Sequence, residues 1–141
     1  MNPGQQFLGY KRFLETLTLD SLESFRDFVS ADVRFRDPFH DCTGARSMEN
    51  ILKTFINNAE EIQYDILEYA CTDNTVFFDW VLHTKMFAKR WTISGSTRIL
   101  FDQQGKVCDH QEYWDAASQV YEKMPFIGAL LRLIRRKISA L

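Results

Sequence analysis

The strongest constraint on the fold is a change in the spacing of hydrophobic residues along the chain. Between residues 62 and 114 apolar and polar side chains mostly alternate, as in strands that bury one face of a sheet. Residues 76–82 and 91–101 follow this alternation, and the turn sequences Asp73-Asn74 and 102–105 each precede a new strand. We therefore predict three long neighbouring strands in an antiparallel, strongly bent sheet.

The first third of the chain has the spacing of helices instead. Apolar residues recur at helical spacing between residues 7 and 17, and a second helix is expected from Asp20-Ser21, with Val29 on its apolar side. A short strand over 33–36 ends before Asp37-Pro38, and a third helix follows. Helices first and strands afterwards predict an α+β fold, in which a cone-shaped, curved and mostly antiparallel sheet has one face covered by helices and the other free.

Length and composition suit a single domain over residues 1–141. The 141 residues are 45% hydrophobic and 14% aromatic, which suits one packed core, and no Pro/Gly/Ser-rich linker divides them. The amino terminus lacks the pattern of a signal peptide, and no apolar run approaches the roughly 20 residues that span a bilayer. A cytoplasmic protein is therefore expected. The three cysteines are odd in number and far apart, which fits reduced thiols.

Charge is distributed unevenly along the chain. The formal net charge is −2, but residues 126–141 carry +4 with no acid, so the rest carries −6. An acidic body without a basic, aromatic face argues against nucleic acid as a partner. Residues 126–141 also have the pattern of an amphipathic helix. This helix could lie on an anionic membrane surface or bind a partner, but we expect it to dock on its own domain or on a second subunit.

The chain contains the stretch FVSADVRFRDP at 28–38, the Thr43-Gly44 turn, a strand start at Gly105 to Val107 and an EYWD ending at 112–115. Together these stretches resemble the nuclear transport factor two-like superfamily, which includes ketosteroid isomerases, SnoaL-like polyketide cyclases and scytalone dehydratase. The resemblance covers about residues 7–118 and leaves residues 115–141 as a helical extension. Its motifs specify the fold well and the activity poorly, because the superfamily includes enzymes, ligand binders and adaptors.

The resemblance implies a role for Asp37. In ketosteroid isomerases the aspartate of the same Asp-Pro is the general base, and a tyrosine and a protonated aspartic acid hold the oxyanion. In this chain Phe13 and Thr97 stand in the places of those two donors. Because a preorganised donor supplies several kcal/mol of transition-state stabilisation, we do not expect steroid isomerase activity.

The last predicted strand supplies further candidates. By its period of two, His110 and Glu112 lie side by side on one face, and the family-like register turns that face toward Asp37 across the pocket. A histidine beside a carboxylate can be held in one tautomer and act as a general acid or base. We therefore predict Asp37, His110 and Glu112 as catalytic residues. The predicted pocket residues are Phe13, Trp80, Trp91, Thr97 and Trp114, with His40 on the rim.

Each candidate also has a structural interpretation. Asp37 before a proline is a common acceptor of turn hydrogen bonds. We favour the interpretation that His110 and Glu112 satisfy one another, or pair with an arginine, in a buried network. His40 fits an exposed turn or the pocket rim better than a catalytic role. A non-haem iron site of His40, His110 and Glu112 could form if the loop folded inward, but no compact motif supports it, so we expect neither a metal nor a cofactor.

Two classes of function remain open. The preferred one is a pocket protein that binds a small apolar molecule and could transform it by proton transfer. The alternative is a non-catalytic module that binds protein or membrane through the sheet face and the basic helix. The first requires an open cavity that reaches Asp37 and His110, whereas the second predicts a filled cone and an exposed apolar stripe on residues 126–141. We also expect a homodimer through the free sheet face, which carries Asp79 and His83.

Overall fold

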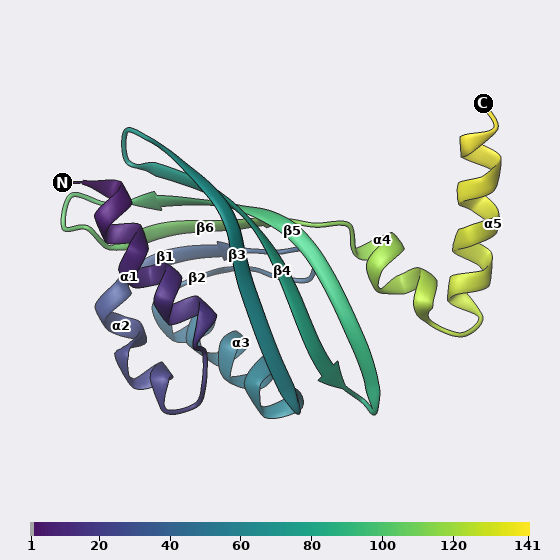
Figure 1. Ribbon diagram of the computed structural model, residues 1–141, viewed down its shortest axis with the longest axis horizontal. Helices are drawn as coiled ribbons and strands as arrows, with labels where there is room; N and C mark the ends of the chain where they lie inside the picture. Colours follow the sequence, from purple (N-terminus) through teal and green to yellow (C-terminus); the bar gives the residue numbers. More distant parts are fainter. Residues whose placement is uncertain (1) are drawn as a thin grey trace.

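The chain folds into helices packed on one curved sheet (Figure 1), and the computed structural model describes residues 2–141. The six strands have the order β2-β1-β6-β5-β4-β3. The pair β1 and β6 is parallel and the other neighbouring pairs are antiparallel, so the sheet is mixed but mostly antiparallel, as predicted. The strands are β1 (Val29–Arg36), β2 (Asp41–Thr43), β3 (Glu61–Thr72), β4 (Thr75–Met86), β5 (Lys89–Phe101) and β6 (Val107–Tyr113).

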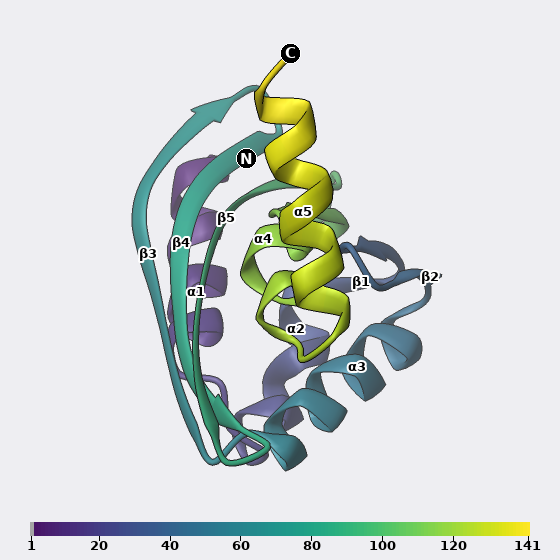
Figure 2. The same cartoon turned by 90° about the vertical axis from the view of Figure 1, so that its right-hand side faces the viewer.

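The first helices lie on the concave face of the sheet (Figure 2). α1 packs against β3 and β4, and α3 packs against β1. The convex face carries no helix from residues 2–141 (Figure 2), so the predicted α+β arrangement is confirmed. These helices are α1 (Pro3–Glu15), η1 (Ser21–Ser24), α2 (Phe25–Phe28) and α3 (Ala45–Asn58).

Local sequence explains where α1 begins but not where α2 ends. The side chain of Asn2 accepts hydrogen bonds from the backbone of Gly4, at 3.0 Å, and of Gln5, at 3.4 Å, which caps α1. The prediction that Val29 belongs to the second helix is wrong, because Val29 starts β1 and pairs with Val107 of β6. Tertiary pairing overrides the local helical spacing here, so β1 begins earlier than the predicted strand.

The hydrophobic core fills the space between α1, α2 and the sheet. Phe7 of α1 packs on Phe78 of β4 with ring centroids 5.0 Å apart. The inward side chains of β4 and β5 follow the predicted alternation, with the intervening residues turned to the convex face. The largest fully buried side chains include Phe7, Tyr10, Phe25, Met48, Val76, Phe78, Ile99 and His110.

The carboxy-terminal segment leaves the body of the domain after β6. It contains α4 (Ala116–Gln119), η2 (Tyr121–Lys123) and α5 (Ile127–Ser139), and α5 stands clear of the sheet (Figure 1). Of the two docking sites predicted for this helix, the body of its own domain is therefore wrong, whereas a second subunit is not tested by the single chain. Its cations instead meet an acid of η2, since Arg135 Nε lies 3.2 Å from Glu122 Oε1. None of the helices within residues 2–141 has both the length and the apolar character needed to cross a membrane.

Candidate active site

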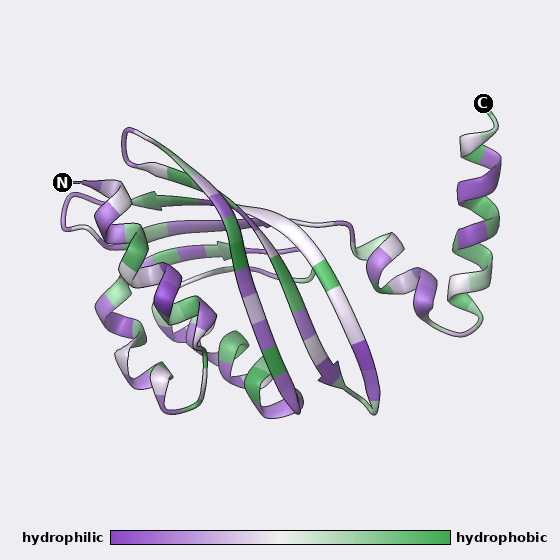
Figure 3. Cartoon of the chain, viewed as in Figure 1, coloured by the Kyte–Doolittle hydropathy of each residue, from purple (hydrophilic) through white to green (hydrophobic). Residues whose placement is uncertain are grey.

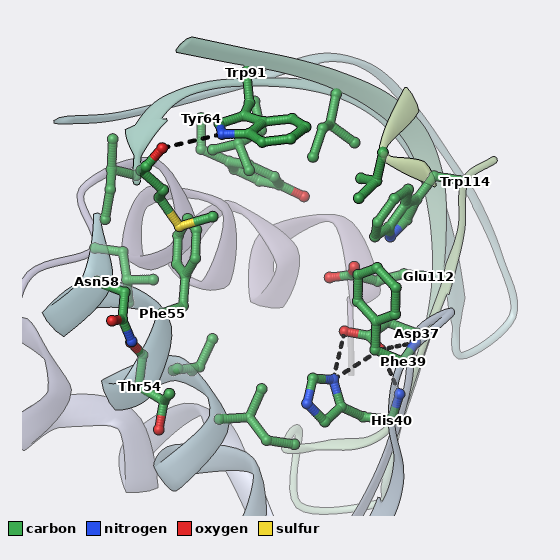
Figure 4. A pocket seen from close by; sticks show the side chains of 18 of the residues that line it. Asp37, Phe39, His40, Thr54, Phe55, Asn58, Tyr64, Trp91, Glu112 and Trp114 are labelled. Atoms are coloured by element: carbon green, nitrogen blue, oxygen red, sulfur yellow. Dashed lines mark hydrogen bonds and ion pairs between the residues drawn. The ribbon is translucent and has the colours of Figure 1, made fainter. Parts of the chain in front are cut away.

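A cavity of about 640 Å³ opens on the concave side of the sheet (Figure 4). Its walls come from α1 and α3, from β1 and the turn after it, from β3, β4, β5 and β6, and from the segment after β6. Trp80, Trp91 and Trp114 line it, and most of its other lining side chains are apolar. The lining residues with exposed side chains form its rim and include Phe39, His40, Thr54, Asn58, Phe87 and Met124.

Asp37 lies where β1 ends and the chain turns toward β2. Its Oδ1 accepts hydrogen bonds from the backbone N–H groups of Phe39, at 2.8 Å, and of His40, at 2.7 Å. This is the turn role that aspartate often plays before a proline. The same carboxylate lines the cavity, so the structure combines the turn position with a position on the wall.

His40 pairs with Asp37 at the rim of the cavity. Its Nδ1 lies 2.9 Å from Asp37 Oδ1 and 3.1 Å from Asp37 Oδ2. An ionised carboxylate only accepts hydrogen bonds, so Nδ1 carries the proton and a neutral ring has its lone pair on Nε2. The two side chains are 12% exposed for Asp37 and 43% for His40. The His40 ring therefore has an Nε2 lone pair at the cavity rim, and part of this ring faces solvent.

Glu112 lies beside Asp37 rather than across the pocket from it. The parallel pairing of β1 and β6 sets Arg36 opposite Gln111, and the next residues are Asp37 and Glu112. Figure 4 shows both carboxylates on the same side of the cavity, near His40. The expectation that Asp37 faces Glu112 from the opposite wall is wrong, because parallel strands bring corresponding residues to the same edge.

His110 does not line the cavity. It is buried behind Glu112, with Nε2 at 3.3 Å from Glu112 Oε1 and Nδ1 at 2.9 Å from the hydroxyl of Tyr10. Burial first, and the negative charge of Glu112 second, raise the pKa of Tyr10, so its hydroxyl keeps its proton. Tyr10 can thus donate to Nδ1 while Nε2–H donates to Glu112, a chain that orients Glu112 from the core.

Phe13 and Thr97 do not line the cavity either, although the sequence placed them there. Phe13 is packed within the helices, with its ring centroid 5.2 Å from that of Phe28 and 5.8 Å from that of Phe25. α1 turns Leu14 toward the cavity instead. Thr97 is fully buried, and its hydroxyl accepts a hydrogen bond of 2.8 Å from Trp80 Nε1. Thr97 therefore fixes the ring of a cavity residue from behind.

Two tyrosines near the site were missed as functional candidates. Tyr64 of β3 lines the cavity and packs on Trp80, with ring centroids 5.4 Å apart. Burial and then the charge of Glu112 raise the pKa of Tyr64, so its hydroxyl remains a donor. The alternation of Ile62, Tyr64 and Ile66 contained the signal for an inward position. Tyr10 has the spacing of a core residue, and only the fold shows its bond to His110.

The proposed iron ligands are not brought together. Within residues 2–141 no three His, Cys, Asp or Glu side chains gather closely enough to hold a metal ion. His40 pairs with Asp37, whereas His110 lies between Tyr10 and Glu112. No arginine joins His110 and Glu112 in the ion pairs found within residues 2–141: Arg36, for example, pairs with Asp109 at 3.1 Å in a half-buried position.

Several solved structures share the fold of this chain at low sequence identity. A putative SnoaL-like polyketide cyclase from Shewanella putrefaciens is 19% identical with a TM-score of 0.70, over 85% of this chain and 97% of that one. A nuclear transport factor 2-like protein of unknown function from Burkholderia pseudomallei is 12% identical with a TM-score of 0.71, over 85% and 96%. An LEH-like epoxide hydrolase from M. tuberculosis is 11% identical with a TM-score of 0.68, over 82% and 84%.

Sequence comparison identifies the family. No curated protein sequence matches the chain. Residues 10–110 match the family model described as a SnoaL-like domain, which is well over half of the chain. The structural likenesses, at identities below those that carry function, agree on the fold. The protein therefore belongs to the SnoaL-like domain family, within the nuclear transport factor two-like superfamily that its motifs resemble.

Proposed function

We propose that the protein binds an apolar small molecule in this cavity and transforms it by proton transfer. The observation that carries the proposal is a pair of neighbouring carboxylates, Asp37 and Glu112, on the wall of an otherwise largely apolar cavity. Each carboxylate is hydrogen-bonded to a histidine of its own, Asp37 to His40 and Glu112 to His110. Polar groups fixed in this way among apolar walls are typical of sites that orient a ligand for chemistry.

The walls support a flat, hydrophobic ligand. Trp80, Trp91 and Trp114 present aromatic surface to the cavity, and its volume of about 640 Å³ is in the range that holds a small organic molecule. The hydrogen bond from Trp80 to Thr97 holds one of these rings in place. Apolar contacts would supply most of the binding free energy, and the carboxylate side would fix the orientation.

His40 is the base in this proposal. Its Nε2 lone pair would take a proton from the ligand, and the Asp37 carboxylate would stabilise the imidazolium that forms. A positioned base of this kind contributes about a hundredfold to ten-thousandfold in rate. Glu112, held by the His110 and Tyr10 chain, is the second proton-transfer group, and the protonated hydroxyl of Tyr64 is the donor for negative charge that develops on a ligand oxygen.

The reaction class follows from these roles. Removing a proton beside a carbonyl group and returning it elsewhere is common to isomerases, cyclases and dehydratase-like lyases. The putative polyketide cyclase among the similar structures supports this class. Steroid isomerisation remains disfavoured, because Phe13 and Thr97 lie away from the cavity and the hydroxyl of Tyr10 is paired with His110.

Ligand binding is tested first. Native mass spectrometry of the purified protein, followed by denaturing extraction, would identify a retained apolar molecule. Independently, binding of the neutral apolar dye Nile red in solution should be lost in Ile93→Trp, which fills the cavity, and kept in Thr92→Trp. Thr92 is an exposed neighbour on the other face of β5, so it is the matched control. Equal dye binding by both variants would contradict a ligand site in this cavity.

Catalysis is tested on the extracted molecule. In heavy water the wild-type protein should exchange a carbon-bound proton of that molecule for deuterium, as detected by mass spectrometry or NMR. His40→Gln and Glu112→Gln should each slow the exchange by about a hundredfold or more. If the protein bound the molecule but exchanged none of its protons, the protein would be a ligand carrier, and the proton-transfer part of the proposal would be contradicted.

A further inference from the structure

Among residues 2–141 the apolar side of α5 has no partner. Leu130, Ile134 and Ile138 recur at helical spacing and are 59%, 44% and 63% exposed. Figure 3 shows hydrophobic and hydrophilic residues interleaved along α5, which stands clear of the sheet. This exposed stripe is the feature that the non-catalytic alternative predicted, and it occurs here together with an open cavity.

α5 is attached to the protein by another of its faces. Arg132 donates a hydrogen bond to the carbonyl oxygen of Glu122, and Arg135 pairs with the Glu122 carboxylate at 3.2 Å. Gly128 lies on this same face, where a Cβ atom would overlap the backbone of Glu122. Because these residues face η2, the stripe of Leu130, Ile134 and Ile138 turns away from the attachment. The helix is thus held in place with its apolar side presented outward.

The charge of the segment identifies the kind of surface that fits it. Residues 126–141 carry +4 without an acid, and the rest of the chain carries −6. Arg132 and Arg135 are held by Glu122, but pairing α5 with α5 of a second copy would still bring Arg136 and Lys137 of each copy near like charges. A lipid bilayer with anionic headgroups offers apolar depth for the stripe and negative charge for its cations. We propose that α5 lies in the interface of an anionic membrane and anchors the protein there.

The position of α5 gives this anchoring a consequence for the cavity. Met124, just before α5, lines the cavity rim, and Lys89 of the β4–β5 hairpin donates a hydrogen bond of 3.2 Å to the carbonyl oxygen of Lys123. If α5 rests on lipid, the cavity rim at Met124 also lies close to the bilayer, because Met124 is only three residues before the start of α5. This step rests on the proposed function: the ligand would be an apolar molecule dissolved in the membrane.

Vesicle sedimentation tests the anchoring with the full chain. Wild-type protein should sediment with vesicles of phosphatidylcholine and phosphatidylglycerol, and much less with phosphatidylcholine alone. Leu130→Ser/Ile134→Ser removes part of the stripe, and Arg136→Glu/Lys137→Glu reverses two cations that lie outside the Glu122 contact. Each should lower partitioning about tenfold or more. Arg46→Glu/Lys53→Glu makes the same charge change on exposed positions of α3 and should stay within about twofold of wild type.

Three results would overturn the inference. Wild-type protein could fail to sediment with anionic vesicles, or the α3 control could lose as much partitioning as the α5 variants. In the third, the protein would not bind vesicles, and sedimentation velocity without lipid would show a dimer that dissociates in the Leu130→Ser/Ile134→Ser variant. That result would assign the stripe to contact with a second copy. Ile93→Trp separates this inference from the proposed function, since it should sediment as wild type while binding no Nile red.

Discussion

Asp37 uses one oxygen for two purposes. Oδ1 accepts the two backbone N–H groups of the turn and also approaches Nδ1 of His40. The turn bonds need only an acceptor, whereas the bond to His40 sets which ring nitrogen carries the proton. Substitutions that keep or remove the acceptor therefore separate the structural role of this residue from its chemical role.

Asp37→Asn should abolish turnover while leaving the thermal midpoint nearly unchanged or raised. The asparagine oxygen can still accept the turn bonds, but an amide N–H₂ takes the place of Oδ2, which lies 3.1 Å from Nδ1 of His40. The neutral side chain also no longer stabilises the imidazolium that forms when His40 takes a proton. Asp37→Ala removes the acceptor as well, and should also cost about 1 kcal/mol, or roughly 4 °C. Calorimetry and the deuterium exchange assay measure the two effects. A destabilised asparagine variant with unchanged exchange would assign Asp37 to the turn alone.

Tyr10 should make the folded state sensitive to alkaline pH. Its pKa is raised in the folded protein, so above the ordinary value of about 10 the unfolded chain releases a proton that the folded chain keeps. The free energy of unfolding then falls with rising pH, by up to about 1.4 kcal/mol per pH unit from this group. Tyr10→Phe should remove that contribution, and should cost about 1 kcal/mol at neutral pH, because His110 loses its donor. Urea unfolding from about pH 8 to 11 measures both slopes, and parallel curves would contradict the prediction.

At the scale of elements, the position of α5 depends on Gly128, where no side chain would fit against the backbone of Glu122. Gly128 lets the first turn of α5 approach Glu122, and the two arginine contacts follow from that approach. Glycine inside a helix usually weakens it by about 1 kcal/mol relative to alanine. Here the close packing of α5 against η2, which only glycine allows, offsets this loss of helix stability.

Gly128→Ala should therefore detach α5 even though alanine is the better helix former. The added methyl group would displace Glu122, so we expect faster proteolysis between Met124 and Ile127 and little change in the global thermal midpoint. Ala129→Gly is the matched control, because it lowers helix propensity at the next, exposed position without touching Glu122. If the control were cleaved faster than Gly128→Ala, propensity rather than packing would govern this segment.

At the scale of the whole molecule, the convex face of the sheet remains the predicted dimer interface. Phe77, beside Asp79 and on the same face as His83, is 48% exposed there. Phe77→Glu should give a monomer in sedimentation equilibrium, and Arg98 opposite on β5 can accommodate the new charge. Leu19→Glu is the control, because Leu19 is also 48% exposed but lies between α1 and η1. A monomeric wild type, or a dimeric Phe77→Glu variant, would contradict this interface.

The sequence predicts the local features of this molecule better than its distant contacts. Alternation identified β4 and β5 and their inner faces, and helical spacing identified α1, α3 and the amphipathic α5. The parallel pairing of β1 with β6 joins segments far apart in the chain, so nothing local predicted that Asp37 and Glu112 would be neighbours. For the same reason His110, on the correct face of its strand, was expected in the cavity and lies behind it.

That parallel pairing also governs when the site can form. Val29 to Arg36 are synthesised early, but their partner strand begins only at Val107, so a growing chain carries Asp37 long before Glu112 exists. Closing so long a loop is entropically costly and slow, so we expect this contact to be among the last to form. Incomplete or partly folded chains therefore hold at most one of the two carboxylates in position. Asp37 and Glu112 become neighbours only when β6 pairs with β1, so under the proposed function we expect partly folded copies to be inactive.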